Sequence, residues 1–179
     1  MVYPREKGDT ETYSLLLAAH SGIMSILSEK FPDTLILPAL GNNDSEFHDN
    51  PIPNNDSFFF YDYLYNLWFR FMPGNVNSLT DDQKSDIYDS FVKGGYYRVD
   101  LNDKLSVISM NTLFFDSERS LDLDASPQGY IELAWLRKQL EEDSDRKFIL
   151  TSHVYAGARY ASWALFLENA NAAYFEILE

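Results

Sequence analysis

Cysteine is absent from the 179-residue sequence, so disulfide bonds and thiolate metal sites are excluded. Basic residues are scarce, with 14 Lys and Arg against 28 Asp and Glu, which gives a net charge of -14 at pH 7. A surface with this charge repels nucleic acids, so we expect no nucleic-acid binding. Long apolar runs are also missing, and we expect no transmembrane segment. Residues 1–7 lack the apolar core of a signal peptide.

The rest of the composition is typical of a folded protein. Hydrophobic residues make up 45% of the chain and aromatic residues 16%, and the length suits one domain with its own core. Many of the aromatic residues gather at 58–71. We interpret this stretch mainly as core, with an apolar wall beside a substrate cleft as the alternative.

The stretch LILPALGNND at 35–44 combines an apolar run with a polar turn. Residues 35–39 are apolar and are bounded by residues that interrupt regular secondary structure, a pattern that predicts a buried strand. The turn that follows contains Gly41, Asn42, Asn43 and Asp44. Polar residues at the carboxyl end of a strand in an α/β sheet are candidates for a ligand site, although an ordinary Asn-rich turn is the alternative.

A second stretch, FILTSHVYAG at 148–157, repeats this arrangement. Its apolar residues 148–150 predict another buried strand, and His153 follows where that strand ends. Imidazole is a common metal ligand. A second candidate ligand therefore lies at the end of a second strand.

The first helix is predicted from Thr10 or Thr12 to Phe31, where Pro32 stops it. Its apolar stripe is expected to pack on a sheet and consists of Leu15, Leu16, Ala19, Ile23, Ile26 and Leu27. His20, on the same helix, is interpreted as an ordinary core or surface residue rather than a metal ligand.

The later segments alternate between strand and helix. A hairpin is predicted over 94–111, a helix over 127–140 and a last helix over 162–178, whereas 80–90 indicates an exposed helix or loop. Asp116 is expected to lie in a solvated surface loop. This alternation, with candidate ligands at strand ends, predicts an α/β fold.

The two turn motifs resemble those of the calcineurin-like metallophosphoesterases, and within them the acid sphingomyelinase-like phosphodiesterases and the endopolyphosphatases. LGNND at 40–44 is similar to the family loop that supplies an asparagine ligand, and SHVYAGARY at 152–160 is similar to the loop that supplies a histidine ligand. GGYYRV at 94–99 and LSVISMNT at 105–112 resemble two family strands. The resemblance covers all but the first ten or so residues.

The resemblance implies a metallophosphoesterase-type αββα sandwich, incomplete here, with a mixed sheet flanked by helices. It implies that Asn42 and His153 bind metal, in a site that holds two divalent ions, most often Zn²⁺. The ions would activate a water molecule for attack on phosphorus. Asp44 and Asn111 are expected to support the ligand loops from behind by hydrogen bonds.

Two further residues are candidates for catalysis. Asn43 stands where many relatives have a histidine, as it does in the endopolyphosphatase branch, and would hold the phosphate through its amide. His48 lies four residues after Asp44 and could protonate the leaving group, with a solvated loop position as the alternative.

The other ligand motifs of the family are not found in the sequence. These are an amino-terminal Asp-x-His, a Gly-Asp loop and a carboxy-terminal Gly-His-x-His, and Asp9 after Gly8 is not preceded by a strand. We therefore expect residues 1–179 to form a single partial phosphoesterase domain with weak metal binding and little turnover. A degenerate domain that acts as a binding or structural module is the alternative.

By resemblance, the substrate is a phosphate ester, namely a lipid head group as in sphingomyelin, a polyphosphate or a nucleotide-type ester. An acid sphingomyelinase-like phosphodiesterase is the first expectation and an endopolyphosphatase the second. The family works mostly in secreted, lysosomal or vacuolar spaces, which is the expected compartment here.

Overall fold

The computed structural model describes residues 10–44, 54–117, 127–160 and 163–179. Within these ranges there are six α-helices, one π-helical turn (η1), one 3-10 turn (η2) and five strands. The helical elements are α1 (Thr10–Lys30), α2 (Asn54–Tyr65), η1 (Asn66–Arg70), α3 (Pro73–Ser78), α4 (Asp81–Gly94), η2 (Thr112–Phe114), α5 (Pro127–Glu142) and α6 (Glu168–Leu178). The strands are β1 (Tyr97–Asn102), β2 (Leu105–Ser109), β3 (Lys147–Thr151), β4 (Ala158–Tyr160) and β5 (Trp163–Ala164).

A three-stranded mixed sheet with the order β1-β2-β3 is the centre of the fold. β1 and β2 form an antiparallel hairpin, whose turn is supported by the Lys104 amide donating to Asn102 Oδ1 at 2.9 Å. β3 is parallel to β2, and α5 makes the crossover between them. The predicted hairpin, the predicted strand at 148–150 and the α/β fold class are confirmed.

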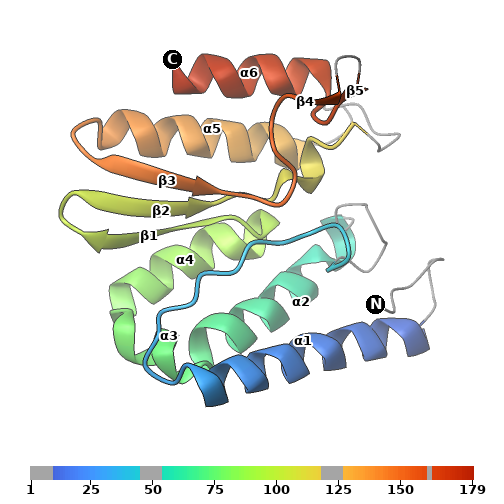
Figure 1. Cartoon of the computed structure of the whole chain (residues 1–179), viewed down its shortest axis with the longest axis vertical. Coiled ribbons are helices and arrows are strands. Elements are labelled where there is room, and N and C mark those ends of the chain that lie inside the picture. The colour runs from blue at the N-terminus through green and yellow to red at the C-terminus, as the bar shows by residue number, and fades with distance from the viewer. Residues whose placement is uncertain (1–9, 45–53, 118–126, 161–162) are drawn as a thin grey trace.

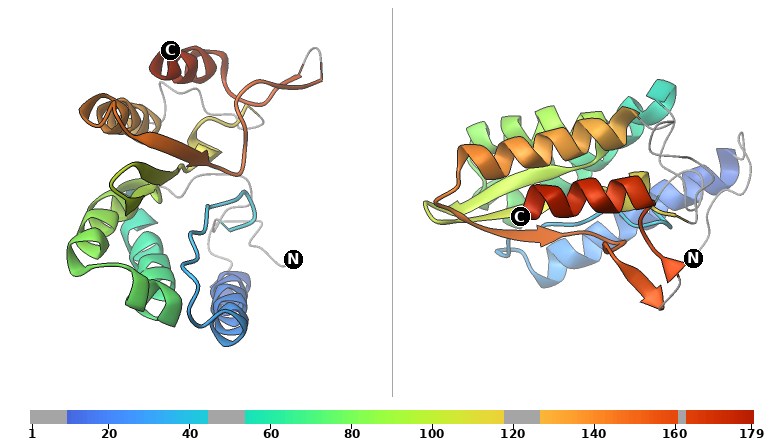
Figure 2. Two further views of the ribbon diagram at one scale, coloured as in Figure 1. Left: turned by 60° about the vertical axis from the view of Figure 1, so that its left-hand side comes forward. Right: turned by 90° about the horizontal axis from the view of Figure 1, so that it is seen from above.

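Helices flank the sheet on both sides (Figure 1). α5 and α6 lie beyond β3 (Figures 1 and 2). On the other side α4 lies next to β1, and α2 and α1 lie farther from the sheet. Each side has its own hydrophobic core: one joins α1, α2, α4 and β1, and the other joins β2, α5 and α6. None of the described helices is long and apolar enough to span a membrane.

The segment at 35–39 is not a strand, contrary to the sequence prediction. It runs extended across the molecule (Figure 1), but its backbone groups form hydrogen bonds with side chains rather than with a neighbouring strand. Asn75 accepts from the Ile36 amide at 2.7 Å and donates to the Ile36 carbonyl at 2.7 Å. The Pro38 carbonyl accepts from the Tyr97 hydroxyl at 2.6 Å and from Ser109 Oγ at 3.2 Å. Pro38 also has no N–H to donate to a strand ladder.

The first helix forms as predicted, but its buried face was wrongly assigned. Its buried positions are Leu16, His20 and Met24, spaced four residues apart. The helix packs against α2 and η1 rather than on the sheet, with the Tyr63 hydroxyl donating to the Leu17 carbonyl at 3.0 Å. As a result, much of the expected stripe faces solvent, namely Leu15, Ala19, Ile23 and Ile26.

The aromatic stretch is mainly core, as predicted. Its buried members are Phe60, Tyr61, Leu64, Tyr65, Trp68 and Phe69. Only Phe58, Phe59 and Phe71 are largely exposed among its aromatic residues. The 80–90 segment belongs to α4, which begins with a capping box between Thr80 and Gln83.

The last helix begins at Glu168 rather than at 162, because the preceding residues form a small β-ribbon of β4 and β5. The Leu165 amide donates to the Gly157 carbonyl at 2.9 Å and so extends this ribbon, and the Leu167 amide donates to the carbonyl of the distant Phe115 at 2.7 Å. Asp116 is buried and forms an isolated β-bridge with Phe166, so its expected solvated position is wrong.

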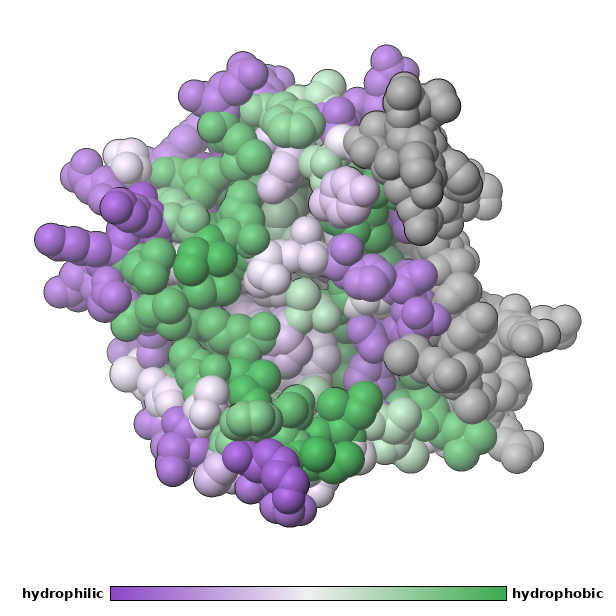
Figure 3. Space-filling model, in the orientation of Figure 1, coloured by the Kyte–Doolittle hydropathy of each residue, from purple (hydrophilic) through white to green (hydrophobic). Residues whose placement is uncertain are grey.

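A broad hydrophobic area lies on the face of the molecule seen in Figure 3. Large apolar side chains that stay half exposed include Ile149 of β3 and, on α1, Ile23 and Ile26. Ile149 pairs with Val107 in the sheet, and the two lie on the same face.

Candidate metal site

The two predicted ligands meet at one point of the structure. Asn42 Oδ1 lies 2.9 Å from His153 Nε2, although the two residues are 111 positions apart in the chain. Asn42 follows the extended 35–39 segment, and His153 lies two residues beyond β3. The site is therefore built by two loops at one edge of the sheet.

The Gly41–Asp44 turn is fastened by its own last residue. The Asp44 amide donates to the Gly41 carbonyl at 3.0 Å, and Asp44 Oδ2 accepts from the Gly41 amide at 2.7 Å. Within the turn, Asn43 Nδ2 donates to Asn42 Oδ1 at 3.2 Å. Asp44 thus holds the turn that presents Asn42, and Asn43 orients the Asn42 side chain.

Gly41 is needed because the histidine ring lies directly against it. A Cβ atom at this position would be 3.2 Å from both Cγ and Nδ1 of His153. That spacing is tighter than an ordinary van der Waals contact. A side chain at Gly41 would push the ring away from Asn42.

His20 is a neighbour of the site that sequence reasoning did not identify. It is only 6% exposed, and its Nε2 lies 3.8 Å from Asp44 Oδ1. Among the described residues no hydrogen-bond partner is found for Nε2. The signal that could have placed it is its spacing of four residues from Leu16 and from Met24, which marks the buried face of α1.

The supporting residue Asn111 follows β2 and is almost completely buried. Its side chain donates to the Gly94 carbonyl at 2.8 Å and to the Tyr61 hydroxyl at 3.2 Å. The next residue, Thr112, accepts from the Val154 amide through Oγ1 at 3.0 Å. The end of β2 is therefore tied to the histidine loop. His48 lies outside the described residues.

The Asn42 and His153 atoms suit a shared divalent ion. The two atoms are hydrogen-bonded to each other at 2.9 Å. A tetrahedral zinc ion with Zn–N and Zn–O distances of about 2.0–2.2 Å holds two ligand atoms roughly 3.4 Å apart, so an ion would replace this hydrogen bond after a movement of about 0.5 Å. An amide oxygen and an imidazole nitrogen are both accepted by zinc and manganese. No group of three or more His, Cys, Asp or Glu residues that could hold a metal is found in the described parts of the chain. The two side chains thus fit an ion as part of its ligand set.

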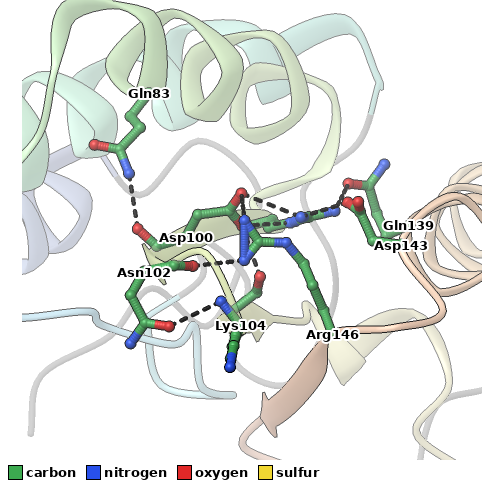
Figure 4. A network of polar contacts seen from close by, with 9 residues as sticks. Gln83, Asp100, Asn102, Lys104, Gln139, Asp143 and Arg146 are labelled. Atoms are coloured by element: carbon green, nitrogen blue, oxygen red, sulfur yellow. Dashed lines mark hydrogen bonds and ion pairs between the residues drawn. The ribbon is translucent and has the colours of Figure 1, made fainter.

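A second polar cluster occupies the opposite end of the sheet (Figure 4). Asp100 accepts from Arg98 at 2.7 Å, from Ser106 at 2.7 Å and from Arg146 at 3.0 Å. Arg98 also pairs with Asp143 at 2.6 Å. Burial alone would raise the pKa of Asp100, but the hydrogen bonds from Arg98 and Ser106 lower it below the usual value. Both arginines are thus neutralised within the cluster, which indicates a structural role.

Comparisons with known proteins agree with the motifs. No protein-family model matches the chain. An endopolyphosphatase of Neurospora crassa is 32% identical in an alignment of 177 positions that covers 92% of this chain and 22% of that protein. The sphingomyelinase phosphodiesterase C of Dictyostelium discoideum is 27% identical over 132 residues, covering 73% of this chain and 26% of that protein.

A third relative is the cyclic GMP-AMP phosphodiesterase SMPDL3A of Bos taurus, which is 29% identical over 143 residues, or 76% of this chain and 28% of that protein. The chain therefore spans between 22% and 28% of the length of these three relatives. All three are calcineurin-like metallophosphoesterases. Similarity over most of its length to endopolyphosphatases and to acid sphingomyelinase-like phosphodiesterases places this chain in the calcineurin-like metallophosphoesterase family.

Proposed function

We propose that Asn42 and His153 bind one of the divalent ions of a phosphoric ester hydrolase. The observation that carries this proposal is the 2.9 Å approach of Asn42 Oδ1 to His153 Nε2. These atoms come from loops far apart in the sequence and converge at one edge of the sheet. The similarity to phosphodiesterases and endopolyphosphatases supports the hydrolase class.

Bound divalent ions, zinc by family resemblance, supply a Lewis acid and lower the pKa of a water molecule. Asn42 contributes a neutral oxygen, and His153 contributes Nε2, which must be free of its proton to act as a ligand. The amide of Asn43 can donate to a phosphate oxygen, but it cannot supply a proton to the leaving group. We assign that proton to His48, which lies four residues after Asp44.

Polyphosphate is the first substrate to test. One endopolyphosphatase match extends over 92% of this chain, although two other endopolyphosphatases match over 73% and 68%, and three phosphodiesterases match over 73% to 78%. A net charge of -14 repels a polyanion at a distance. Hydrolysis of polyphosphate should therefore accelerate when salt screens this repulsion, while hydrolysis of a small phosphodiester should depend much less on salt.

The decisive experiment is calorimetric titration of the chain with Zn²⁺ and Mn²⁺. Asn42→Ala and His153→Ala should each weaken binding at least tenfold, because each removes a ligand atom. Asn77→Ala is the matched control, since Asn77 is exposed on α3. Equal affinity in the wild type and both ligand variants would overturn the assignment of these residues.

Hydrolysis of polyphosphate and of a chromogenic phosphodiester should be measured on the same samples. We expect low turnover from this chain, because the sequence contains none of the other three ligand motifs of the family. Metal-dependent turnover that is lost in His153→Ala would contradict that expectation and would identify a catalytic chain. Metal binding without turnover agrees with a module that binds but does not hydrolyse.

A further inference from the structure

Glu132 is a carboxyl group buried in the middle of α5, with none of its surface exposed. Its Oε1 accepts a hydrogen bond from the backbone amide of Asn111 at 2.8 Å. Its Oε2 is buried and has no hydrogen-bond partner among the described residues. Glutamate is almost never fully buried unless it is paired, because its charged form loses hydration. Glu132 thus places a polar group on the apolar face of α5, where it lowers stability unless it has a structural role.

The partner of Glu132 lies where several elements meet. Asn111 directly precedes η2, and its side chain donates to Gly94 at the end of α4 and to Tyr61 of α2. Its own Oδ1 accepts from the Leu113 amide at 3.4 Å. Glu132 of α5 accepts from the backbone amide of Asn111. Four separate elements are therefore fastened to one residue.

This junction extends to the histidine loop. Met110, just before Asn111, donates its amide to the Thr151 carbonyl at 2.9 Å. Thr112, just after Asn111, accepts from the Val154 amide at 3.0 Å. The bonds to Thr151 and Val154 therefore enclose His153 on both sides. The position of the ring depends on where the chain runs through Asn111.

The junction also reaches the asparagine loop. Leu40 precedes Gly41 and is buried against Gly95 and Tyr61. A Cβ atom at Gly95 would be 2.3 Å from Leu40 Cδ1 and 2.9 Å from Tyr61 Cε1, so these groups are in close contact. Tyr61, through its hydroxyl, is the same residue that binds Asn111. Both loops of the site are thus connected to one group of buried side chains, by packing at Leu40 and by hydrogen bonds around Asn111.

We propose that Glu132 is a positioning residue that sets the separation of Asn42 and His153 by fixing Asn111. This inference rests on the proposed function only in assigning a metal to that pair of side chains. Burial raises the pKa of Glu132 well above its ordinary value, which favours the protonated form, and the group acts through its hydrogen bond to the Asn111 backbone. Groups that hydrogen-bond directly to a metal ligand typically change metal affinity 10- to 100-fold when removed, and Glu132 acts on His153 through Asn111 and Thr112.

The test measures the histidine loop directly, without metal. Amide hydrogen exchange at Val154 and the ring resonances of His153 are recorded by NMR in the wild type, Glu132→Leu and Glu132→Gln. Glu132→Leu removes the acceptor for the Asn111 amide, and Val154 should exchange at least tenfold faster with a shifted His153 signal. Glu132→Gln retains an acceptor oxygen and should restore both to wild-type values. Glu142→Leu is the control, because Glu142 is exposed on the same helix.

Thr112→Val tests the link between this junction and the histidine loop if Glu132→Leu does not fold. It removes the hydroxyl that accepts from Val154 and leaves Glu132 untouched, so Val154 exchange should again rise at least tenfold, while Thr112→Ser should preserve it. Unchanged Val154 exchange and unchanged His153 resonances in Glu132→Leu, or in Thr112→Val where the first variant is unfolded, would overturn the inference.

Metal titration of the same variants separates this inference from the proposed function. If the wild type binds Zn²⁺, Glu132→Leu should weaken its affinity at least tenfold and Glu132→Gln should not. If the wild type binds no Zn²⁺, the metal assignment fails, while the exchange and ring measurements still decide whether Glu132 positions His153.

Discussion

Two carboxyl groups near opposite ends of the sheet have pKa values that are shifted in opposite directions. Glu132, behind the candidate metal site, is completely buried, and its pKa is raised by loss of hydration. Asp100, at the other end of the sheet, is partly exposed and paired with Arg98 and Arg146, and its pKa is lowered. Glu132 fastens the chain by accepting a hydrogen bond from a backbone amide, and Asp100 does so through ion pairs.

The difference follows from what each end must do. A fixed cation beside the ligand loops would repel a divalent ion, whereas neutral hydrogen bonds hold the loops and leave the local potential unaffected. At the far end there is no such requirement, and guanidinium groups can cross-link β1, α5 and the loop before β3. Hydrogen bonds through Glu132 and Asn111 therefore support the site, whereas ion pairs through Asp100 support the fold at the other end of the sheet.

The largest effect on stability should come from adding a side chain at Gly95, in the buried junction around Asn111. Gly95 has φ +76 and ends α4 in the left-handed region, where a Cβ would also clash with Leu40 and Tyr61. Gly95→Ala should lower the free energy of unfolding by about 3 kcal/mol, from backbone strain together with overpacking. Gly22→Ala is the control, because nothing lies within 4 Å of a Cβ there, and it should stabilise α1 by about 0.5 to 1 kcal/mol. Urea unfolding of both variants tests this, and equal stability would show that the junction is loosely packed.

The second effect is the pH dependence of the buried carboxyl. The folded pKa of Glu132 lies above its unfolded value, so its favourable contribution is complete below about pH 4 and is lost as the pH rises through the folded pKa. Glu132→Gln does not titrate, so its stability relative to the wild type should increase by about 1.4 kcal/mol for each pH unit above that point, until the folded pKa is reached. Urea unfolding at pH 5, 6 and 7 measures the slope. A difference independent of pH would mean that Glu132 is ionised in the folded protein.

The smallest effect is expected for Asp100, at the other end of the sheet, and its pH dependence has the opposite sign to that of Glu132. Because the folded pKa of Asp100 is lowered, its contribution is present above the ordinary Asp pKa and is lost as the pH falls through the folded value. Asp100→Asn should cost about 1 kcal/mol at pH 7, since solvent screens a partly exposed network. The cost should shrink in 1 M salt and below pH 4, whereas the effect of Glu132→Gln should be insensitive to salt. Thermal unfolding with and without salt distinguishes the two.

Local patterns predicted the elements whose contacts are close in sequence. The β1–β2 hairpin, the helix α5 and the strand before His153 follow from periodicity and turn residues. The motifs also picked out Asn42 and His153, and the structure brings them together. Whether they bind metal is a prediction for calorimetry to test.

Features set by distant side chains could not be predicted in this way. The 35–39 segment resembles a strand, but the side chain of Asn75, 39 residues away from Ile36, takes the place of a neighbouring strand. Glu132 lies within an apolar face and would ordinarily be assigned to solvent, since only the fold shows the amide that it binds. The exposed apolar residues of α1 likewise depend on which neighbour the helix meets.

The long separation of Asn42 and His153 in the chain has a consequence for folding. Their contact closes a loop of 111 residues. Such a closure costs about 4 kcal/mol of chain entropy, more than one hydrogen bond provides. The contact therefore forms only when most of the chain is already native, and an unfolded chain has no preformed site for an ion. An ion held by both loops would act as a clamp across the whole molecule, so its occupancy would measure how completely the chain has folded.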